Sequence, residues 1–372
     1  MRPNRVLLSW TAVAAVGATF LLLGMVVGAF GPLLEHLTRR FAVSLPVAGS
    51  TISVYFGGSL GGVFAAMRAV QSVSGRAVVT TANGVAAVGC AVVAFAPSWP
   101  FFLAGVLVIG VGFGALVLGL NQIVAYSEGP RRAALLNALN AAYSAGAVVG
   151  PILVALLAAD HFAELYLGAG IVALVLAAGA SRIVGRLPVG IGRPGRPEML
   201  LLVFIVGFVL YVALENGTGG WMASHLESIG VGSRTAAGLT SGFFLALMTG
   251  RLLITLVPSS VSEARIVLAG AATATLALAL ASVHSVAPIA YVLTGLAIAP
   301  IFPTGIVWLS RLRPGDSRAT AWLYPAASIG GVTGPGVIAL VIAGVGVEWT
   351  PAVLAVVAAA MLFAFWRAAV SA

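Results

Sequence analysis

Twelve long apolar segments, separated by short turns or charged residues, constrain this chain more than any other feature of its sequence. Each is far longer than the roughly 10 residues of a membrane-spanning strand, and none alternates with a period of two. We therefore expect twelve helices, each long enough to cross a bilayer. Their approximate ranges are 8–36, 46–67, 76–96, 99–126, 132–158, 162–185, 198–226, 234–257, 264–282, 286–310, 317–343 and 348–370. The separation between the third and fourth, at residues 97–100, is the weakest of these divisions.

Composition leads to the same fold class. Of the 372 residues 60% are hydrophobic and 8% are charged, whereas a soluble domain carries about 25% charged residues. Too few charges are present to cover a surface in water, so the bilayer must be the solvent. The first apolar segment follows Arg2 and Arg5 like a signal peptide, but it is too long and many equivalents follow, so we interpret it as the first span.

The basic residues are all arginines, and they predict the orientation of the chain. If the N-terminus is cytoplasmic, sixteen of the 19 fall on the cytoplasmic side and three, Arg39, Arg40 and Arg234, on the other. This asymmetry predicts an even number of spans with both termini cytoplasmic, in a multi-pass protein of the cytoplasmic membrane. The arginines lie in short loops and not on one continuous face, which argues against a nucleic-acid partner.

The longest polar connection divides the chain into two halves. It predicts an N-terminal six-helix bundle at 1–185, a cytoplasmic linker at 186–197 and a C-terminal six-helix bundle at 198–372. Two pseudo-symmetric bundles of six helices are the organisation of two-lobed rocking transporters. The 46 glycines, including four within 57–62, allow close helix contacts, either for static packing or for a sliding surface.

One carboxylate lies within a predicted span. Nine of the ten acidic residues fall in loops or near helix ends, but Glu215 lies inside 198–226. A charge at the bilayer centre costs at least about 2.5–3.5 kcal/mol, so Glu215 is our candidate for proton coupling. It could instead hydrogen-bond substrate hydroxyls, or be a protonated residue that holds neighbouring helices together.

The residues after Glu215 extend this candidate site. The run 216–220 contains three glycines and is poor helix material, which predicts that the seventh helix is broken there and lines a cavity. Asn216 is included as a substrate-binding residue. Trp221 either stacks on a substrate ring or is an interfacial anchor.

Polar residues of the fourth and fifth segments form a second cluster of candidates. Asn121 and Gln122 lie in the fourth, while Asn140 and Tyr143 lie one turn apart in the fifth. Amides and phenols both donate and accept hydrogen bonds, which suits a hydroxyl-rich substrate. Hydrogen bonds between helices are the alternative role.

In the second half, Pro300 and Pro303 bracket Phe302 and predict a kink in the tenth helix. Phe302 and Trp322 are aromatic candidates for the substrate site, although lipid-facing or core positions are common for such residues. Arg68 and Arg251 are candidate gating residues or, alternatively, anchors at the membrane interface.

Several other functions lack the residues that they need. A Gly-rich phosphate loop requires a lysine, and the chain has none, which argues against an ATP-driven pump. Cys90 is the only cysteine, so no intrachain disulfide forms, and the four histidines show no metal-ligand spacing. We therefore expect no cofactor, no metal and no catalytic residue.

Several motifs resemble those of a known family. They are Gly31-Pro32-Leu33-Leu34, Gly75-Arg76, Gly119-Leu120-Asn121-Gln122, residues 136–147, Tyr211 to Glu215, Gly219-Gly220-Trp221 and residues 299–304. Together the chain resembles the major facilitator superfamily, and within it the branch of the fucose–proton symporter, the sodium-glucose-type members and the fungal bypass-of-stop-codon members. The resemblance implies that Asn140 and Tyr143 lie where the fucose symporter has amide side chains at its sugar.

The chain also departs from this pattern. Ser72 stands at the aspartate position of the signature loop after the second helix, and Gly31 and Val117 stand where the fucose symporter has its coupling acids. A coupling proton must therefore be handled elsewhere in this chain, which leaves Glu215.

We therefore expect a secondary active transporter, monomeric and not an enzyme, that moves a small sugar-like solute by alternating access. Its expected partners are that solute, the bilayer and a proton, or sodium, as coupling ion. The alternatives are an exporter of lipophilic or drug-like compounds and, from another class, a membrane receptor or scaffold that does not transport.

Overall fold

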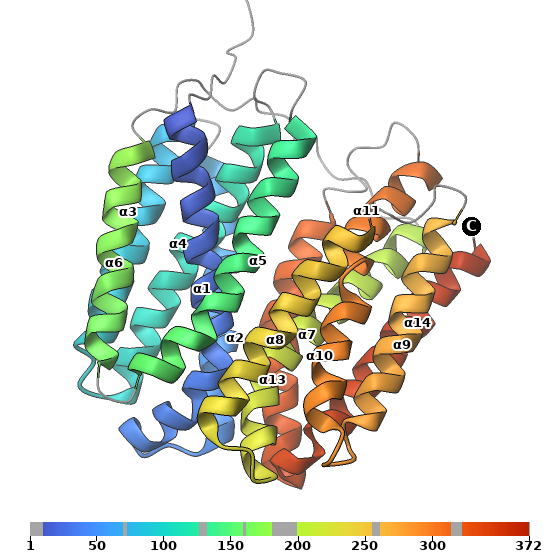
Figure 1. Ribbon diagram of the computed structural model, residues 1–372. Coiled ribbons are helices and arrows are strands. Elements are labelled where there is room, and N and C mark those ends of the chain that lie inside the picture. The colour runs from blue at the N-terminus through green and yellow to red at the C-terminus, as the bar shows by residue number, and fades with distance from the viewer. Residues whose placement is uncertain are drawn as a thin grey trace, which may run out of the picture. The chain divides into compact units, whose positions relative to one another are not determined.

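The computed structural model describes residues 10–69, 73–125, 132–158, 161–180, 199–254, 261–313 and 322–371 (Figure 1). These residues form helices joined by short connections, with no strand among them. The first six helices are α1 (Trp10–Phe41), α2 (Leu45–Ala69), α3 (Gly75–Ala94), α4 (Trp99–Ala125), α5 (Arg132–Leu157) and α6 (Phe162–Gly179). The others are α7 (Met199–Ser228), α8 (Ser233–Leu253), α9 (Glu263–Leu280), α10 (Ala287–Ile298), α11 (Ile301–Leu312), α13 (Leu323–Val345), η3 (Val347–Trp349) and α14 (Thr350–Ser371).

The predicted all-helical membrane architecture is confirmed. Within the described residues, eleven helical segments are long and apolar enough to cross a membrane, and Ala141–Leu157 is a shorter apolar helix. The separation of the third and fourth spans is also confirmed, because α3 ends at Ala94 and α4 begins at Trp99. Most other boundaries fall within a few residues of the predicted ones.

The chain divides into two compact units. Unit 1 comprises Met1–Ala29, Arg39–Val43 and Val54–Gly190, and unit 2 comprises Phe30–Thr38, Ser44–Ser53 and Ile191–Ala372. Segments of α1 and α2 therefore belong to the second unit, although most of both helices belongs to the first. The predicted linker at 186–197 lies outside the described residues, so its role remains a prediction.

Glycines bring the helices of unit 1 into backbone contact. A Cβ on Gly24 of α1 would collide with the backbone carbonyl of Tyr143 on α5, and one on Gly146 of α5 with the carbonyl of Leu21. Gly58 on α2 and Gly110 on α4 mark a second crossing of this kind. Contacts between small residues are how membrane helices pack without a hydrophobic driving force.

Unit 2 repeats this pairing of helices within itself. A Cβ on Gly334 of α13 would meet Ala213 of α7, and one on Gly295 of α10 would meet the backbone of Phe243 on α8. The first helix of each half thus crosses the fifth, and the second crosses the fourth, as two pseudo-symmetric bundles require.

The tenth span is interrupted where its prolines predicted a kink. Helix α10 ends at Ile298, a turn covers Ala299 and Pro300, and α11 begins at Ile301. Pro300 has no N–H to continue the helical bonds of α10, and it caps the N-terminus of α11.

The predicted break in the seventh span is wrong. Helix α7 is continuous from Met199 to Ser228 and includes all of 216–220. Its glycines lie where neighbours approach: Gly217 faces Ile338 and Leu354, Gly219 faces Phe244, and Gly220 faces Ile52. The absence of side chains there serves packing on several sides of the helix, and this packing outweighs the low helix propensity of glycine.

Candidate functional site

A stripe along one side of α7 leads to the candidate site. Phe204, Phe208, Tyr211 and Glu215 follow one another at spacings of four, three and four residues, which places them on one face of the helix. The first three are fully buried, and Glu215 is partly exposed. The stripe therefore changes from aromatic to acidic near the middle of the span.

Arg251, in the last turn of α8, faces Glu215. One guanidinium nitrogen, Nη2, lies 3.4 Å from Glu215 Oε1 and 3.3 Å from the hydroxyl oxygen of Tyr211. The Arg251 side chain is 21% exposed and that of Glu215 is 15% exposed, so neither is sealed inside the protein. A lone carboxylate or a lone guanidinium would be energetically costly within a membrane-spanning segment, and pairing the two neutralises both charges.

An aromatic wall lies beside this ion pair. The ring of Phe302 on α11 lies 5.7 Å from that of Tyr211 and 5.1 Å from that of Phe208. On the next turns, Trp308 packs against Phe204 at 4.9 Å. The break between α10 and α11 allows the chain to bring Phe302 to this position. Three predicted residues, Glu215, Arg251 and Phe302, thus meet around Tyr211.

Two other predicted residues of α7 point elsewhere. Asn216 donates from Nδ2 to the carbonyl of Val212 at 3.0 Å, one turn back on its own helix. Trp221 is fully buried, lies against Gly49 of α2, and donates its indole N–H to the carbonyl of Pro335 at 3.3 Å. Because protein covers the Trp221 ring in this structure, a solute can contact the ring only after a conformational change. Its substrate-binding role therefore remains a prediction.

The candidates of unit 1 are placed only in part. Asn121 is half-buried and donates to the carbonyl of Val117 at 2.7 Å, and Tyr143 is half-buried on α5. The side chains of Gln122 and Asn140 lie outside the described residues. Nothing places these residues around one solute, so their roles remain predictions.

The remaining predicted residues are Arg68 and Trp322. Arg68 is exposed in the last turn of α2, as a residue at a membrane interface would be, and Trp322 is half-buried directly before α13. Their roles in gating and in substrate binding also remain predictions.

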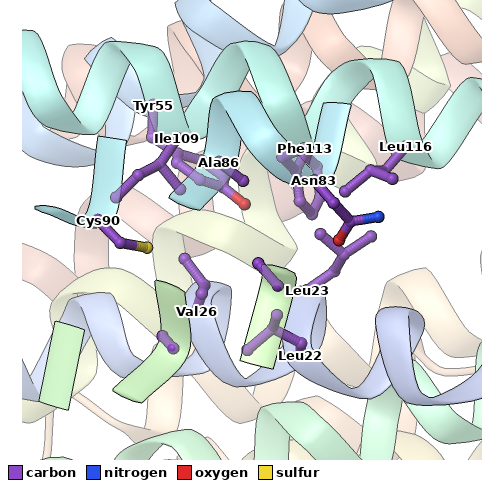
Figure 2. A pocket seen from close by; sticks show the side chains of 12 residues that line it. Leu22, Leu23, Val26, Tyr55, Asn83, Ala86, Cys90, Ile109, Phe113 and Leu116 are labelled. Carbon is purple, nitrogen blue, oxygen red and sulfur yellow. The ribbon is translucent and has the colours of Figure 1, made fainter. Parts of the chain in front are cut away.

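Unit 1 contains a small cavity lined by residues of α1, α2, α3, α4 and α6 (Figure 2). Leu22 and Val26 of α1, Asn83 and Cys90 of α3 and Phe113 of α4 are among the residues that line it, and its free volume is about 20 Å³. That is room for one water molecule and not for a sugar. This cavity is therefore not the solute site.

Asn83 is the polar group of this cavity that sequence reasoning missed. It is fully buried, and its Nδ2 donates to the carbonyl of Val79 at 3.0 Å, while Oδ1 has no hydrogen-bond partner among the residues that the structure describes. In the sequence Asn83 follows two threonines and an alanine and precedes a glycine, which gave no signal beyond its residue type.

A second missed pair lies toward the C-terminal end of α7. His225 and Tyr291 are both fully buried, and His225 Nδ1 lies 3.1 Å from the Tyr291 hydroxyl. The other ring nitrogen, Nε2, has no hydrogen-bond partner within the described part of the chain. Tyr211 was missed as well, although its position one turn before Glu215 was a signal. In the part of the chain that the structure describes, no three His, Cys, Asp or Glu side chains gather as a metal site.

Comparisons with known proteins agree with this architecture. A family model described as Major Facilitator Superfamily matches residues 16–253, more than half of the chain. No curated protein sequence matches the chain.

Three solved structures share the fold along nearly the whole length. A D-xylose–proton symporter has a TM-score of 0.78 at 14% identity and covers 96% of this chain and 97% of its own. A bacterial homologue of the human lysosomal transporter Spinster has a TM-score of 0.78 at 13% identity, with 96% of both chains covered. The fucose:proton symporter of E. coli has a TM-score of 0.67 at 16% identity and covers 96% and 98%.

At these identities the structures show the fold alone, and the match to the family model shows the family. The expected resemblance is confirmed: the chain belongs to the major facilitator superfamily and is a multi-pass membrane transporter, not an enzyme.

Proposed function

We propose that this transporter moves a small, sugar-like polar solute across the cytoplasmic membrane by alternating access, and that Glu215 carries the coupling proton. The observation that carries this proposal is the contact of 3.4 Å between Glu215 Oε1 and Arg251 Nη2. The sequence identified Glu215 by its position alone. The contact makes it one partner of an ion pair, and the net charge of this pair changes when a proton binds to Glu215.

The Glu215 carboxylate has two alternative partners, the Arg251 guanidinium and a proton. When Glu215 is ionised it pairs with Arg251, and when a proton neutralises Glu215 this attraction is lost. The net charge of the Glu215–Arg251 pair next to a bound solute therefore differs between the two states. Coupling follows because the occupancy of the proton site changes the surroundings of the solute site.

The expected sugar-like solute draws support from the neighbours of the ion pair. Tyr211 and Phe302 place two rings next to the charged groups, and an aromatic face beside hydrogen-bonding groups suits the apolar and polar faces of a sugar ring. The same aromatic wall is compatible with a lipophilic solute, so the transport test includes one.

Reconstituted proteoliposomes with a pH-sensitive dye inside test the proposal. We expect the addition of a transported sugar or sugar derivative to acidify the lumen of liposomes that hold the parent protein. Glu215→Gln should still exchange labelled for unlabelled solute, because exchange needs no net proton movement. It should not accumulate solute when a pH gradient is the driving force. Gradient-driven accumulation by Glu215→Gln equal to that of the parent would disprove the role of Glu215.

A Thr275→Ala variant is the control, since Thr275 on α9 is a polar residue of unit 2 outside the candidate site, and its hydroxyl is bonded to its own helix. It should keep proton-driven accumulation. If lipophilic cations were transported and every sugar and sugar derivative were not, the exporter alternative would replace the proposed solute class.

A further inference from the structure

The face of α7 that carries Glu215 continues to the C-terminal end of the helix. Thr218, Met222 and His225 follow Glu215 at spacings of three, four and three residues, so all four side chains lie on one face. The three added residues are fully buried. In the predicted orientation this end of α7 is extracellular. One buried face, about 15 Å long, thus connects the carboxylate with the outer end of the helix.

The hydroxyl of Thr218 differs from those of other buried threonines in unit 2. Thr240 on α8 and Thr294 on α10 each donate to the carbonyl four residues before them, at 3.0 and 2.9 Å, as threonines within helices commonly do. Thr218 is equally buried, but its Oγ1 has no hydrogen-bond partner among the described residues. Leaving a buried hydroxyl without a partner costs free energy, so we expect another state in which it has one.

His225 is the second group of this kind on the same face. Its Nδ1 lies 3.1 Å from the hydroxyl of Tyr291 on α10, a helix that packs beside α7 (Figure 1). Its Nε2 is buried without a hydrogen-bond partner in the part of the chain that the structure describes. An imidazole can accept a proton on one ring nitrogen and release one from the other, which suits it to proton transfer.

Two exposed residues place His225 close to the water outside. His284, in the connection between α9 and α10, and Glu348, in η3, are both exposed and both act electrostatically on the His225 ring. With Tyr291, they are the titratable groups that neighbouring elements present to His225. The ring is thus buried, yet near side chains that exchange protons with water.

Met222 interrupts this polar face. It lies between Thr218 and His225 and is fully buried, so the described side chains form no continuous hydrogen-bonded path to Glu215. Alternating access requires such an interruption in any state that is closed to the outside. Water that enters along this face in another state would give Thr218 Oγ1 and His225 Nε2 the partners that they lack here.

We propose that His225 and Thr218 form a relay through which protons from the extracellular side reach Glu215. His225 accepts a proton from outside water on one ring nitrogen and releases one from the other to water that has entered along α7. The Thr218 hydroxyl positions this water beside Glu215, whose carboxylate takes the proton. This inference rests on the proposed function, because it adds a route to the proton site assigned there.

Chemical rescue tests the role of His225. The parent and His225→Ala are reconstituted in proteoliposomes with an alkaline lumen, and the probe is the sugar that the parent accumulates from a panel of labelled glucose, galactose, xylose and fucose. Proton-driven uptake by His225→Ala should be at least about tenfold slower than that of the parent. Exchange of labelled for unlabelled sugar should stay within about twofold, because it needs no net proton movement.

Imidazole in the medium should restore much of the proton-driven uptake of His225→Ala. Pyrazole, a ring of the same size that is not protonated near neutral pH, should not. The parent with the same additions controls for effects of either compound on the pH gradient. Equal rescue by both rings would mean that His225 only fills space, and would overturn the inference.

The hydroxyl of Thr218 is tested by a pair of substitutions. Thr218→Val keeps the shape of the side chain and should slow proton-driven uptake about tenfold while exchange is retained. Thr218→Ser keeps the hydroxyl and should behave like the parent. Thr240→Val is the matched control, since Thr240 is equally buried and its hydroxyl is bonded to its own helix. An equal effect of the two valine substitutions would contradict the role of Thr218.

If His225→Ala does not fold, the double variant His225→Phe with Tyr291→Phe replaces it, because it removes both members of the buried polar pair. It should exchange sugar but lack proton-driven uptake, and parental uptake by this folded variant would overturn the inference. Parental uptake by the His225 and Thr218 variants, with loss of uptake in Glu215→Gln, would refute the relay alone. If Glu215→Gln keeps proton-driven uptake, or the parent accumulates no sugar of the panel, the proposed function fails and the relay fails with it.

Discussion

The indole ring of Trp221 on α7 occupies the space that Gly49 on α2 leaves open by having no side chain. A Cβ at residue 49 would collide with the outer atoms of the ring, whose N–H donates a hydrogen bond to the carbonyl of Pro335. All three residues belong to unit 2. The segment Ser44–Ser53 of α2 is thus packed against α7 through one residue that has to be small.

Gly49→Ala should therefore destabilise the protein by about 1–3 kcal/mol, the usual cost of overfilling a packed site. Gly57→Ala is the matched control, because it lies on the same helix and a Cβ there meets no atom of the described residues within 4 Å. It should be neutral or slightly stabilising, since alanine is the better helix former. Thermal unfolding in detergent measures both, and an equal effect of the two substitutions would contradict the role of Trp221.

Tyr291→Phe should cost about 1–3 kcal/mol of stability, because it removes the hydrogen-bond partner of Nδ1 on the buried His225. Replacing His225 as well, by phenylalanine, removes the buried polar group. The double variant His225→Phe with Tyr291→Phe should therefore recover most of the stability that Tyr291→Phe loses.

A thermodynamic cycle of the two single variants and the double variant measures this coupling. Additive losses would mean that the contact of 3.1 Å between the two side chains contributes nothing to stability.

Asn83→Leu should raise the unfolding temperature, because it replaces a buried amide whose Oδ1 has no partner by an apolar group of similar size. The control is Asn121→Leu. Asn121 also donates to the carbonyl four residues before it, but it is only half-buried, so its replacement should gain less.

The two substitutions are compared by thermal unfolding under one condition. A loss of stability in Asn83→Leu would show that Oδ1 has a partner such as a bound water in the cavity of Figure 2.

The predicted orientation can be tested with single cysteines in a Cys90→Ala background. Ser44, between α1 and α2, and Val73, between α2 and α3, are both exposed and lie in successive connections. With both termini cytoplasmic, Ser44→Cys should react with a membrane-impermeant maleimide in intact cells, and Val73→Cys should react only after the cells are opened. The reverse pattern would invert the predicted topology.

The helices of this protein were predictable because a bilayer demands long apolar segments, and few other arrangements of these residues satisfy that demand. The kink at Pro300 was predictable for a similarly local reason, since proline has no N–H for the helical hydrogen bond, although α1, α5 and α13 continue through Pro32, Pro151 and Pro335. Such features depend on neighbours in sequence and need no knowledge of the tertiary structure.

Features that depend on distant neighbours were predicted less well. The glycines of 216–220 predicted a break in the helix, but glycine also permits close packing. The contacts of these glycines with Ile52, Phe244 and Ile338 show that close packing is their role here. Glu215 was identified from its position in the span. Its pairing with Arg251, 36 residues away, required the structure, as did the burial of Trp221.

Helix α1 runs over 32 residues, which corresponds to a length of about 48 Å. Pro32 lies inside it, within the segment Phe30–Thr38 that belongs to unit 2. A proline has no N–H to donate to the carbonyl four residues before it, and its ring crowds that carbonyl. The axis of α1 therefore has a built-in flexure point at Pro32, about two thirds of the way along the helix.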